Sequence, residues 1–240
     1  MKEIDLINLR ADLQEQAFSL LDQGKDKEAG ECMIESAELG DVLSQYYAGC
    51  WYENGYGLEQ DYIKAAEFYE KVSACREMVV FADPFMPLTP QCDAEFALGK
   101  LYERGLLPNA SMEKAIEWYE KAIADGSSEA TFEFASRYFN ELDFDRSAAY
   151  LLAAANGYPT EQLKKEIFAH CLSLLQKETS YEVQLLRLIA ELYGKGWGTE
   201  INSEKAKEYF ERAAIREQML KSKFTWEGKF DGRALDNFVL

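Results

Sequence analysis

The stretch from Cys92 to Gly126 decides the fold, and it reads CDAEFALGKLYERGLLPNASMEKAIEWYEKAIADG. In its first half, apolar and small side chains recur every three or four residues, which is the spacing of one helical face, and Gly105 falls where a helix normally stops. The second half repeats this spacing up to Gly126, with charged residues mostly on the opposite side. The stretch therefore predicts two amphipathic helices joined by a turn.

The same helix-turn-helix unit recurs along the chain. At an interval of 50 residues, Gly99, Tyr102, Gly105, Ala115 and Tyr119 match identical residues, namely Gly49, Tyr52, Gly55, Ala65 and Tyr69. At an interval of 91, identical residues appear again as Leu192, Tyr193, Gly196, Lys205, Ala206 and Ala213. A further copy begins 36 residues after Ala94, with a shorter loop. Repeats of this period indicate an α-solenoid, in which each helix pair buries its apolar face against its neighbours.

At these positions the chain resembles the Sel1-like repeat family, which is related to the tetratricopeptide repeat. The matching residues are Leu98-Gly99, Tyr102, Gly105, Lys114-Ala115, Trp118-Tyr119 and Lys121-Ala122. The resemblance covers residues 40–157 and 181–217, roughly two thirds of the chain. It implies an all-α, right-handed α-solenoid of about eleven helices. It also implies a scaffold that binds other proteins rather than an enzyme, and it names no partner.

We expect one solenoid over residues 1–240, interrupted by irregular segments. These are a degenerate capping repeat at 1–40, a proline-rich insertion at 75–91, an extra helix at 159–176, and a C-terminal cap or tail at 218–240. Three prolines spaced by three residues favour an extended, polyproline-like insertion. This insertion either binds a partner or packs back over its own repeat.

Composition limits the partners. The formal charge of −17, from 43 acidic and 26 basic residues, opposes binding to nucleic acid or to an anionic membrane, because both require Lys and Arg. It favours a basic protein or peptide, unless the acidity only keeps a helical scaffold soluble. The chain shows neither a run of about 20 apolar residues nor a signal peptide, so we expect a cytoplasmic protein. The five cysteines form no CxxC motif, and we expect them to be reduced and mostly buried.

Motifs for catalysis are missing from the sequence. It has a single histidine, His170, without a second histidine, cysteine or carboxylate at metal-ligand spacing. Neither a phosphate loop nor a nucleophile elbow is present. We therefore predict no enzymatic activity, no metal and no cofactor.

The candidate binding residues follow from the expected stacking of the repeats. If the first helix of each pair lines a concave face, positions three before and one after the Gly99 equivalent point into it. These positions hold an aromatic column and charged neighbours, and the insertion adds apolar side chains beside them. The predicted partner-binding residues are Tyr46, Phe96, Lys100, Phe132 and Arg187, with Phe81, Phe85, Met86 and Leu88 from the insertion. Asp93, Glu103 and Glu129 would supply negative charge for a basic segment. Internal packing is the alternative role for the aromatic residues.

Two functions remain open at this point. The first is a general adaptor whose groove holds a peptide or a helix of a partner. The second is a dedicated inhibitor, such as an immunity protein that neutralises a basic toxin or nuclease. The sequence leaves the partner and the oligomeric state open.

Overall fold

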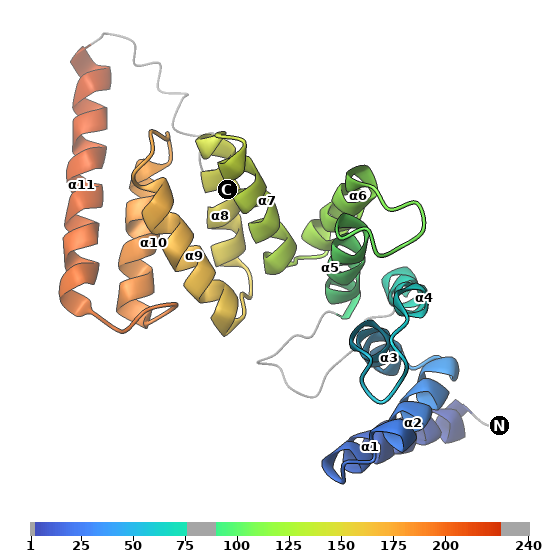
Figure 1. The fold of residues 1–240 in the computed structure, drawn as a ribbon. Coiled ribbons are helices and arrows are strands. Elements are labelled where there is room, and N and C mark those ends of the chain that lie inside the picture. Colours follow the sequence, from blue (N-terminus) through green and yellow to red (C-terminus); the bar gives the residue numbers. More distant parts are fainter. Residues whose placement is uncertain (1–2, 76–89, 227–240) are drawn as a thin grey trace. The chain divides into compact units, whose positions relative to one another are not determined.

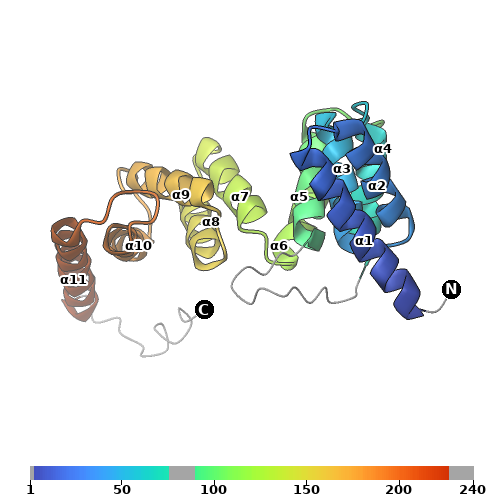
Figure 2. The same cartoon turned by 90° about the horizontal axis from the view of Figure 1, so that it is seen from below.

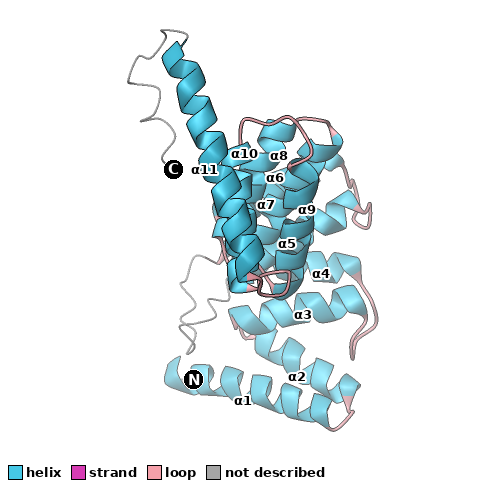
Figure 3. Cartoon of the chain, turned by 90° about the vertical axis from the view of Figure 1, so that its left-hand side faces the viewer, coloured by secondary structure: helices cyan, strands magenta, loops and turns pink. Residues whose placement is uncertain are grey.

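Eleven α-helices account for most of the part of the chain that the computed structural model describes, residues 3–75 and 90–226. They are α1 (Glu3–Asp22), α2 (Asp26–Glu38), α3 (Val42–Asn54), α4 (Tyr62–Ala74), α5 (Pro90–Glu103), α6 (Met112–Ala124), α7 (Ser128–Asn140), α8 (Phe144–Asn156), α9 (Glu161–Leu174), α10 (Glu182–Lys195) and α11 (Ser203–Trp226). Within these residues, only helices and loops occur (Figure 3). The expected all-α fold of about eleven helices is confirmed.

The chain divides into two compact units, unit 1 (Met1–Ala130) and unit 2 (Thr131–Leu240). In unit 1, the helices pair as α1 with α2, α3 with α4, and α5 with α6 (Figures 1 and 2). The second helix of a pair also contacts the first helix of the next pair, and α3 contacts α5 directly. This is the packing that an array of helix pairs needs to bury its apolar faces. The division of the chain into one solenoid with four irregular segments stays a prediction.

A contact between glycine and tyrosine explains two of the repeated residues. A Cβ atom added to Gly49 would lie 2.6 Å from the ring of Tyr69, and one added to Gly99 would lie 2.5 Å from the ring of Tyr119. Both tyrosines are almost completely buried. The repeat therefore keeps glycine on its first helix because a large ring of the second helix lies directly against the backbone.

A second repeated feature is a stack of two aromatic rings with a cation above it. Tyr52 stacks on Phe68 at 5.9 Å and 14°, and Tyr193 stacks on Tyr209 at 5.8 Å and 24°. The lysine of each Lys-Ala pair lies over the tyrosine, with Lys64 Nζ 5.1 Å from the Tyr52 ring. Lys205 Nζ lies 5.0 Å from the Tyr193 ring in the same way. The stack thus joins both helices of a pair, and a positive charge lies over its tyrosine ring.

Two glycines of the expected turns are required by close backbone contacts. Gly57 and Gly198 have φ angles of 65° and 71°, a conformation that suits glycine best. A Cβ atom on Gly57 would lie 2.1 Å from the carbonyl oxygen of Asp26, and one on Gly198 would lie 2.2 Å from that of Lys164. Each loop therefore lies directly against the first turn of a helix that precedes its own pair.

In unit 2, α9 is the extra helix that the sequence predicted. Thr160 caps it, because its hydroxyl accepts a hydrogen bond from the backbone N–H of Leu163 at 3.2 Å. Helix α9 contacts both α8 and α10, and α8 contacts α10, so these three helices have the same mutual contacts as α3, α4 and α5. Helix α11 pairs with α10 and continues to Trp226.

All five cysteines carry free thiols; Cys92 and Cys171 are buried, and the other three are half-buried. Burial raises the pKa of the Cys171 thiol. In the described ranges, none of the helices is long and apolar enough to cross a membrane.

Candidate partner-binding face of unit 1

Six side chains on α3 and α5 form what we call the repeat face. They are Tyr46, Cys50 and Glu53 on α3, and Phe96, Lys100 and Glu103 at the equivalent positions of α5, fifty residues later. All six are half-buried, so each lies at the surface with part of its side chain against the core. Three of them, Tyr46, Phe96 and Lys100, are residues that the sequence predicted as partner-binding.

The aromatic part of the repeat face is larger than the sequence predicted. The ring of Tyr46 lies 6.1 Å from that of Tyr69 and 5.9 Å from that of Tyr47. Tyr47 in turn meets Phe18 of α1 edge to face at 5.2 Å. Phe18 keeps 39% of its surface exposed. The aromatic contacts therefore extend from α3 to α1, and we call Phe18, Tyr47 and Tyr46 the aromatic strip.

On α5, Phe96 and Lys100 form a pair of their own. The ring of Phe96 lies 5.7 Å from the ring of the buried Tyr119, which fixes its inner edge. Lys100 Nζ lies 5.5 Å from the centre of the Phe96 ring, at the distance of a cation–π contact. Phe96 is thus half-buried and contacts both Tyr119 and Lys100.

Two carboxylates of the repeat face are oriented by the buried tyrosines. The hydroxyl of Tyr69 donates a hydrogen bond to Glu53 at 2.8 Å, and the hydroxyl of Tyr119 donates one to Glu103 at 2.7 Å. Arg104 adds a loose ion pair with Glu53 at 3.9 Å. Because the same contact occurs in both pairs, the carboxylates occupy equivalent, fixed positions on α3 and α5.

Asp93 is the third carboxylate beside the repeat face. Burial and the negative charge of Glu129 raise its pKa to about 6, while a weak hydrogen bond from Cys92 acts in the opposite direction. Its charge also acts on Tyr46 and Cys50 of α3. Burial is the main cause that raises the pKa of both of these groups, so both are neutral at pH 7. Asp93 is therefore mostly charged at neutral pH, although its surroundings stabilise the carboxylate poorly. A positive charge nearby would stabilise the carboxylate.

The two predicted binding residues of unit 2 have partners within the chain. Phe132 is half-buried, and its ring lies 5.6 Å from the imidazole of His170 on α9. Arg187 is exposed and pairs with Glu217 of α11 at 2.6 Å. The remaining predicted residues, Phe81, Phe85, Met86 and Leu88, lie outside the described residues. The binding role of every predicted residue stays a prediction.

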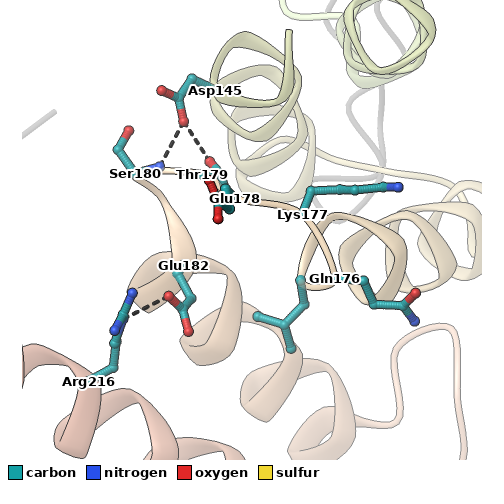
Figure 4. A pocket seen from close by; sticks show the side chains of 9 residues that line it. Asp145, Gln176, Lys177, Glu178, Thr179, Ser180, Glu182 and Arg216 are labelled. Atoms are coloured by element: carbon teal, nitrogen blue, oxygen red, sulfur yellow. Dashed lines mark hydrogen bonds and ion pairs between the residues drawn. The ribbon is translucent and has the colours of Figure 1, made fainter. Parts of the chain in front are cut away.

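A polar pocket of about 580 Å³ lies in unit 2, between the loop before α10, the start of α8, and α11 (Figure 4). The side chain of Asp145 accepts hydrogen bonds from the Thr179 hydroxyl and the Ser180 backbone N–H, both at 2.7 Å. These bonds lower the pKa of Asp145. Arg216 pairs with Glu182 at 2.7 Å. These groups therefore anchor the loop between α9 and α10 to its neighbours, which gives the pocket a structural role.

Among the described residues, no group of three or more His, Cys, Asp or Glu side chains is arranged to hold a metal ion. Ser147 and His170 lie 3.3 Å apart, but the Ser147 hydroxyl is fully buried and donates a hydrogen bond to the Ala135 carbonyl at 2.7 Å. A hydroxyl in that position is not exposed to a substrate, so this pair lacks the geometry of a catalytic dyad.

The packing described above defines the class of the protein. Helix pairs that are held together internally by glycine–tyrosine contacts or aromatic stacks, and that pack on one another in unit 1, make it an α-solenoid. More particularly, the model of the Sel1 repeat matches residues 42–74, 92–127 and 186–216, so the chain is a Sel1-repeat protein with three matched repeats. The resemblance expected from the sequence is confirmed.

One of three similar solved structures supports this fold. A Sel1 repeat protein from Oxalobacter formigenes is 19% identical, with a TM-score of 0.53 over 90% of this chain and 91% of that one. A protective antigen of uropathogenic Escherichia coli is 17% identical, with a TM-score of 0.33 over 95% of this chain and 58% of its own. An immunity protein, Pa5087 from Pseudomonas aeruginosa, is 14% identical, with a TM-score of 0.33 over 86% of this chain and 81% of that one. The last two likenesses support no inference about this chain. None of the curated proteins compared matches the sequence.

Proposed function

We propose that this protein is a non-enzymatic scaffold that binds a basic, partly apolar segment of another protein on the repeat face of unit 1. Proteins built of Sel1 repeats are generally scaffolds for protein–protein interactions. The finer parts of the proposal are the place of binding and the chemistry of the partner.

The observation that carries the proposal is the alternation of aromatic and acidic groups on α3 and α5. Tyr46 and Phe96 are half-buried rings held from below by Tyr69 and Tyr119, so little side-chain entropy is lost when a partner covers them. Glu53 and Glu103 are held by the hydroxyls of the same tyrosines. Rigid aromatic residues are the usual anchors at the centre of an interface, and polar groups usually surround them at its rim.

The charge of the partner follows from the carboxylates. Asp93, with its raised pKa, and Glu53 and Glu103 lie beside the rings, and the whole chain has a formal charge of −17. A Lys or Arg of the partner would compensate the charge of Asp93 and would be attracted by the field of the whole protein. We therefore expect a partner segment that combines basic residues with one or two apolar anchors.

The test is selection of binders from a random peptide library, followed by titration of a selected peptide. We expect enrichment of Lys and Arg with apolar residues, and an affinity that falls as salt rises. Tyr46→Ala combined with Phe96→Ala should weaken binding by about tenfold or more, or about 1.4 kcal/mol. Tyr158→Ala is the matched control, because this tyrosine is 83% exposed in unit 2 and lies outside the repeat face. Equal affinity of the double variant and the control would contradict the proposal.

The same measurements separate an adaptor from a dedicated inhibitor. An adaptor binds short peptides detectably. An inhibitor of a basic toxin or nuclease binds one folded protein tightly, with an association rate that falls steeply with salt. We also propose that Phe85 and Leu88 of the proline-rich insertion contact the partner. Phe85→Ala combined with Leu88→Ala should therefore weaken binding and leave the helical fold intact.

A further inference from the structure

The single histidine of the chain, His170, lies at a contact between three helices of unit 2. It belongs to the extra helix α9 and is half-buried. Two phenyl rings of α7 meet its imidazole edge to face, Phe139 at 4.8 Å and Phe132 at 5.6 Å. From α8, the Ser147 hydroxyl approaches its Nε2 atom at 3.3 Å. The imidazole thus connects α9 to both α7 and α8.

The hydrogen bonds around Ser147 define the neutral form of the imidazole. The hydroxyl has one proton, which it donates to the carbonyl oxygen of Ala135 at 2.7 Å. Ser147 can therefore only accept from His170, which places the proton of the neutral ring on Nε2. A second proton would enter at Nδ1 and bring a full positive charge into a site otherwise bordered by two phenyl rings.

No opposite charge compensates for that second proton within the described part of unit 2. Burial alone lowers the pKa of His170 from its ordinary value of 6.5, and none of the charged groups contributes to the shift. The groups that face the ring from α7 and α8 are phenyl rings and a hydroxyl, none of which ionises near neutral pH. Folding of this site therefore favours the neutral ring.

We propose that His170 is a pH-sensitive contact: its protonation weakens the packing of α9 on α7 and α8 and frees the ring of Phe132 at mildly acidic pH. Helix α9 interrupts the two-helix rhythm of the chain and lies between α8 and α10, so its packing decides how unit 2 is held together. Above pH 6.5 the contact contributes its full stability, and this contribution is lost as the pH falls through the folded-state pKa.

The experiment uses the full chain and needs no mutation at first. Because the chain has one histidine, its C2 proton gives a single titrating imidazole signal in an NMR spectrum. We expect a midpoint below 6.5. Over the same pH range, amide hydrogen exchange, corrected for its intrinsic pH dependence, should become faster in α7 and α9. Exchange in α3 and α4 of unit 1 serves as the internal control and should not accelerate.

The matched variant is His170→Gln, whose side-chain amide can still donate to Ser147 but has no charge at any of these pH values. We expect this variant to keep the protection of α7 and α9 as the pH is lowered. Three results would overturn the proposal: a midpoint at or above 6.5, exchange in α7 and α9 that does not change through the titration, or the same pH dependence in His170→Gln. If the variant fails to fold, the titration and exchange of the wild-type chain still decide the question.

Discussion

The α5–α6 pair of unit 1 and the α10–α11 pair of unit 2 both have a lysine over the tyrosine of their first helix, but their close contacts differ. In unit 1, Gly99 lies against the buried ring of Tyr119. At the equivalent positions of unit 2, ninety-one residues later, Ala190 is buried and Phe210 is 47% exposed. The cation-covered tyrosine recurs in both units, as Tyr102 and Tyr193. The tyrosine covered by a lysine is therefore the constant part of these two pairs, whereas the close glycine–tyrosine contact occurs in unit 1.

The two units also differ in how they bind protons. In unit 1, Asp93 has a raised pKa, so its proton stabilises the folded state. In unit 2, His170 has a lowered pKa, so its proton destabilises the folded state. At these two groups, acidification therefore stabilises the folded state of unit 1 and destabilises that of unit 2, so their pH dependence distinguishes the two sites.

The largest expected effect comes from filling the close contact between Gly99 and Tyr119. Gly99→Ala forces a Cβ atom against the Tyr119 ring and should lower the free energy of unfolding by about 2 to 3 kcal/mol. Gly194→Ala is the control in unit 2, because its Cβ atom would meet only Ala206 at 3.9 Å. This control should be neutral or stabilising by up to about 1 kcal/mol, since alanine is the better helix former. Urea denaturation measures both, and equal effects would show that the two pairs pack alike.

The next effect tests the raised pKa of Asp93 in unit 1. The folded chain holds the Asp93 proton more tightly than the unfolded chain does, so the free energy of unfolding falls as the pH rises from about 4 to about 6. Asp93→Asn removes the charge and should stabilise the protein by about 2 kcal/mol at pH 7.5. At pH 4 the stabilisation should vanish. Denaturation curves at both pH values measure the free energy of unfolding. A stabilisation at pH 4 as large as at pH 7.5 would show that the charge of Asp93 is not its cause.

A smaller effect tests whether α3–α4 and α5–α6 are equivalent within unit 1. Tyr69→Phe and Tyr119→Phe each remove one hydroxyl that donates to a carboxylate, Glu53 and Glu103 respectively. Each should cost about 1 kcal/mol, because both carboxylates remain half-exposed to water. Thermal unfolding of the two variants provides the measurement. A cost in one repeat only would show that the two carboxylates are not held in the same way.

The smallest effect concerns cations that lie over an aromatic ring of the second helix of a pair. Lys121 Nζ lies 3.7 Å from the centre of the Trp118 ring, and the guanidinium of Arg212 lies 4.8 Å from that of Tyr209. Lys121→Gln and Arg212→Gln should each cost about 0.5 kcal/mol. Chemical denaturation at low and high salt separates this contribution from general surface electrostatics, which salt screens. A stabilising change in either variant would argue against the contact.

The repeat register predicted the all-α fold of about eleven helices, because residue spacing reflects which side chains share a helix face. It missed the aromatic strip for a definite reason. Phe18 lies six residues before Gly24, at the position that Gly49 and Gly99 occupy in their own repeats. The degenerate first repeat departs from the register there, and its phenyl ring contacts Tyr47 instead.

Spacing also could not show which predicted residues have partners within the chain. Phe132 occupies the position equivalent to Phe96, but the extra helix brings His170 against it. This contact joins helices that belong to no common repeat, so no periodic signal records it. In the same way, the lysines of the Lys-Ala pairs look like solvated charges in the sequence, whereas their stems bring the ammonium groups over tyrosine rings.

The loop glycines Gly57 and Gly198 bear on how such a chain can be rearranged. Each lies against the first turn of the helix before its pair, α2 in one case and α9 in the other. The α10–α11 pair therefore meets α9 just as a regular pair meets the last helix of the pair before it. In this array an extra helix is thus accommodated where its first turn places a backbone carbonyl against the loop glycine of the following pair. We therefore expect that the three helices from α9 to α11 can be transferred together to another repeat array, because this keeps the contact between Gly198 and the first turn of α9.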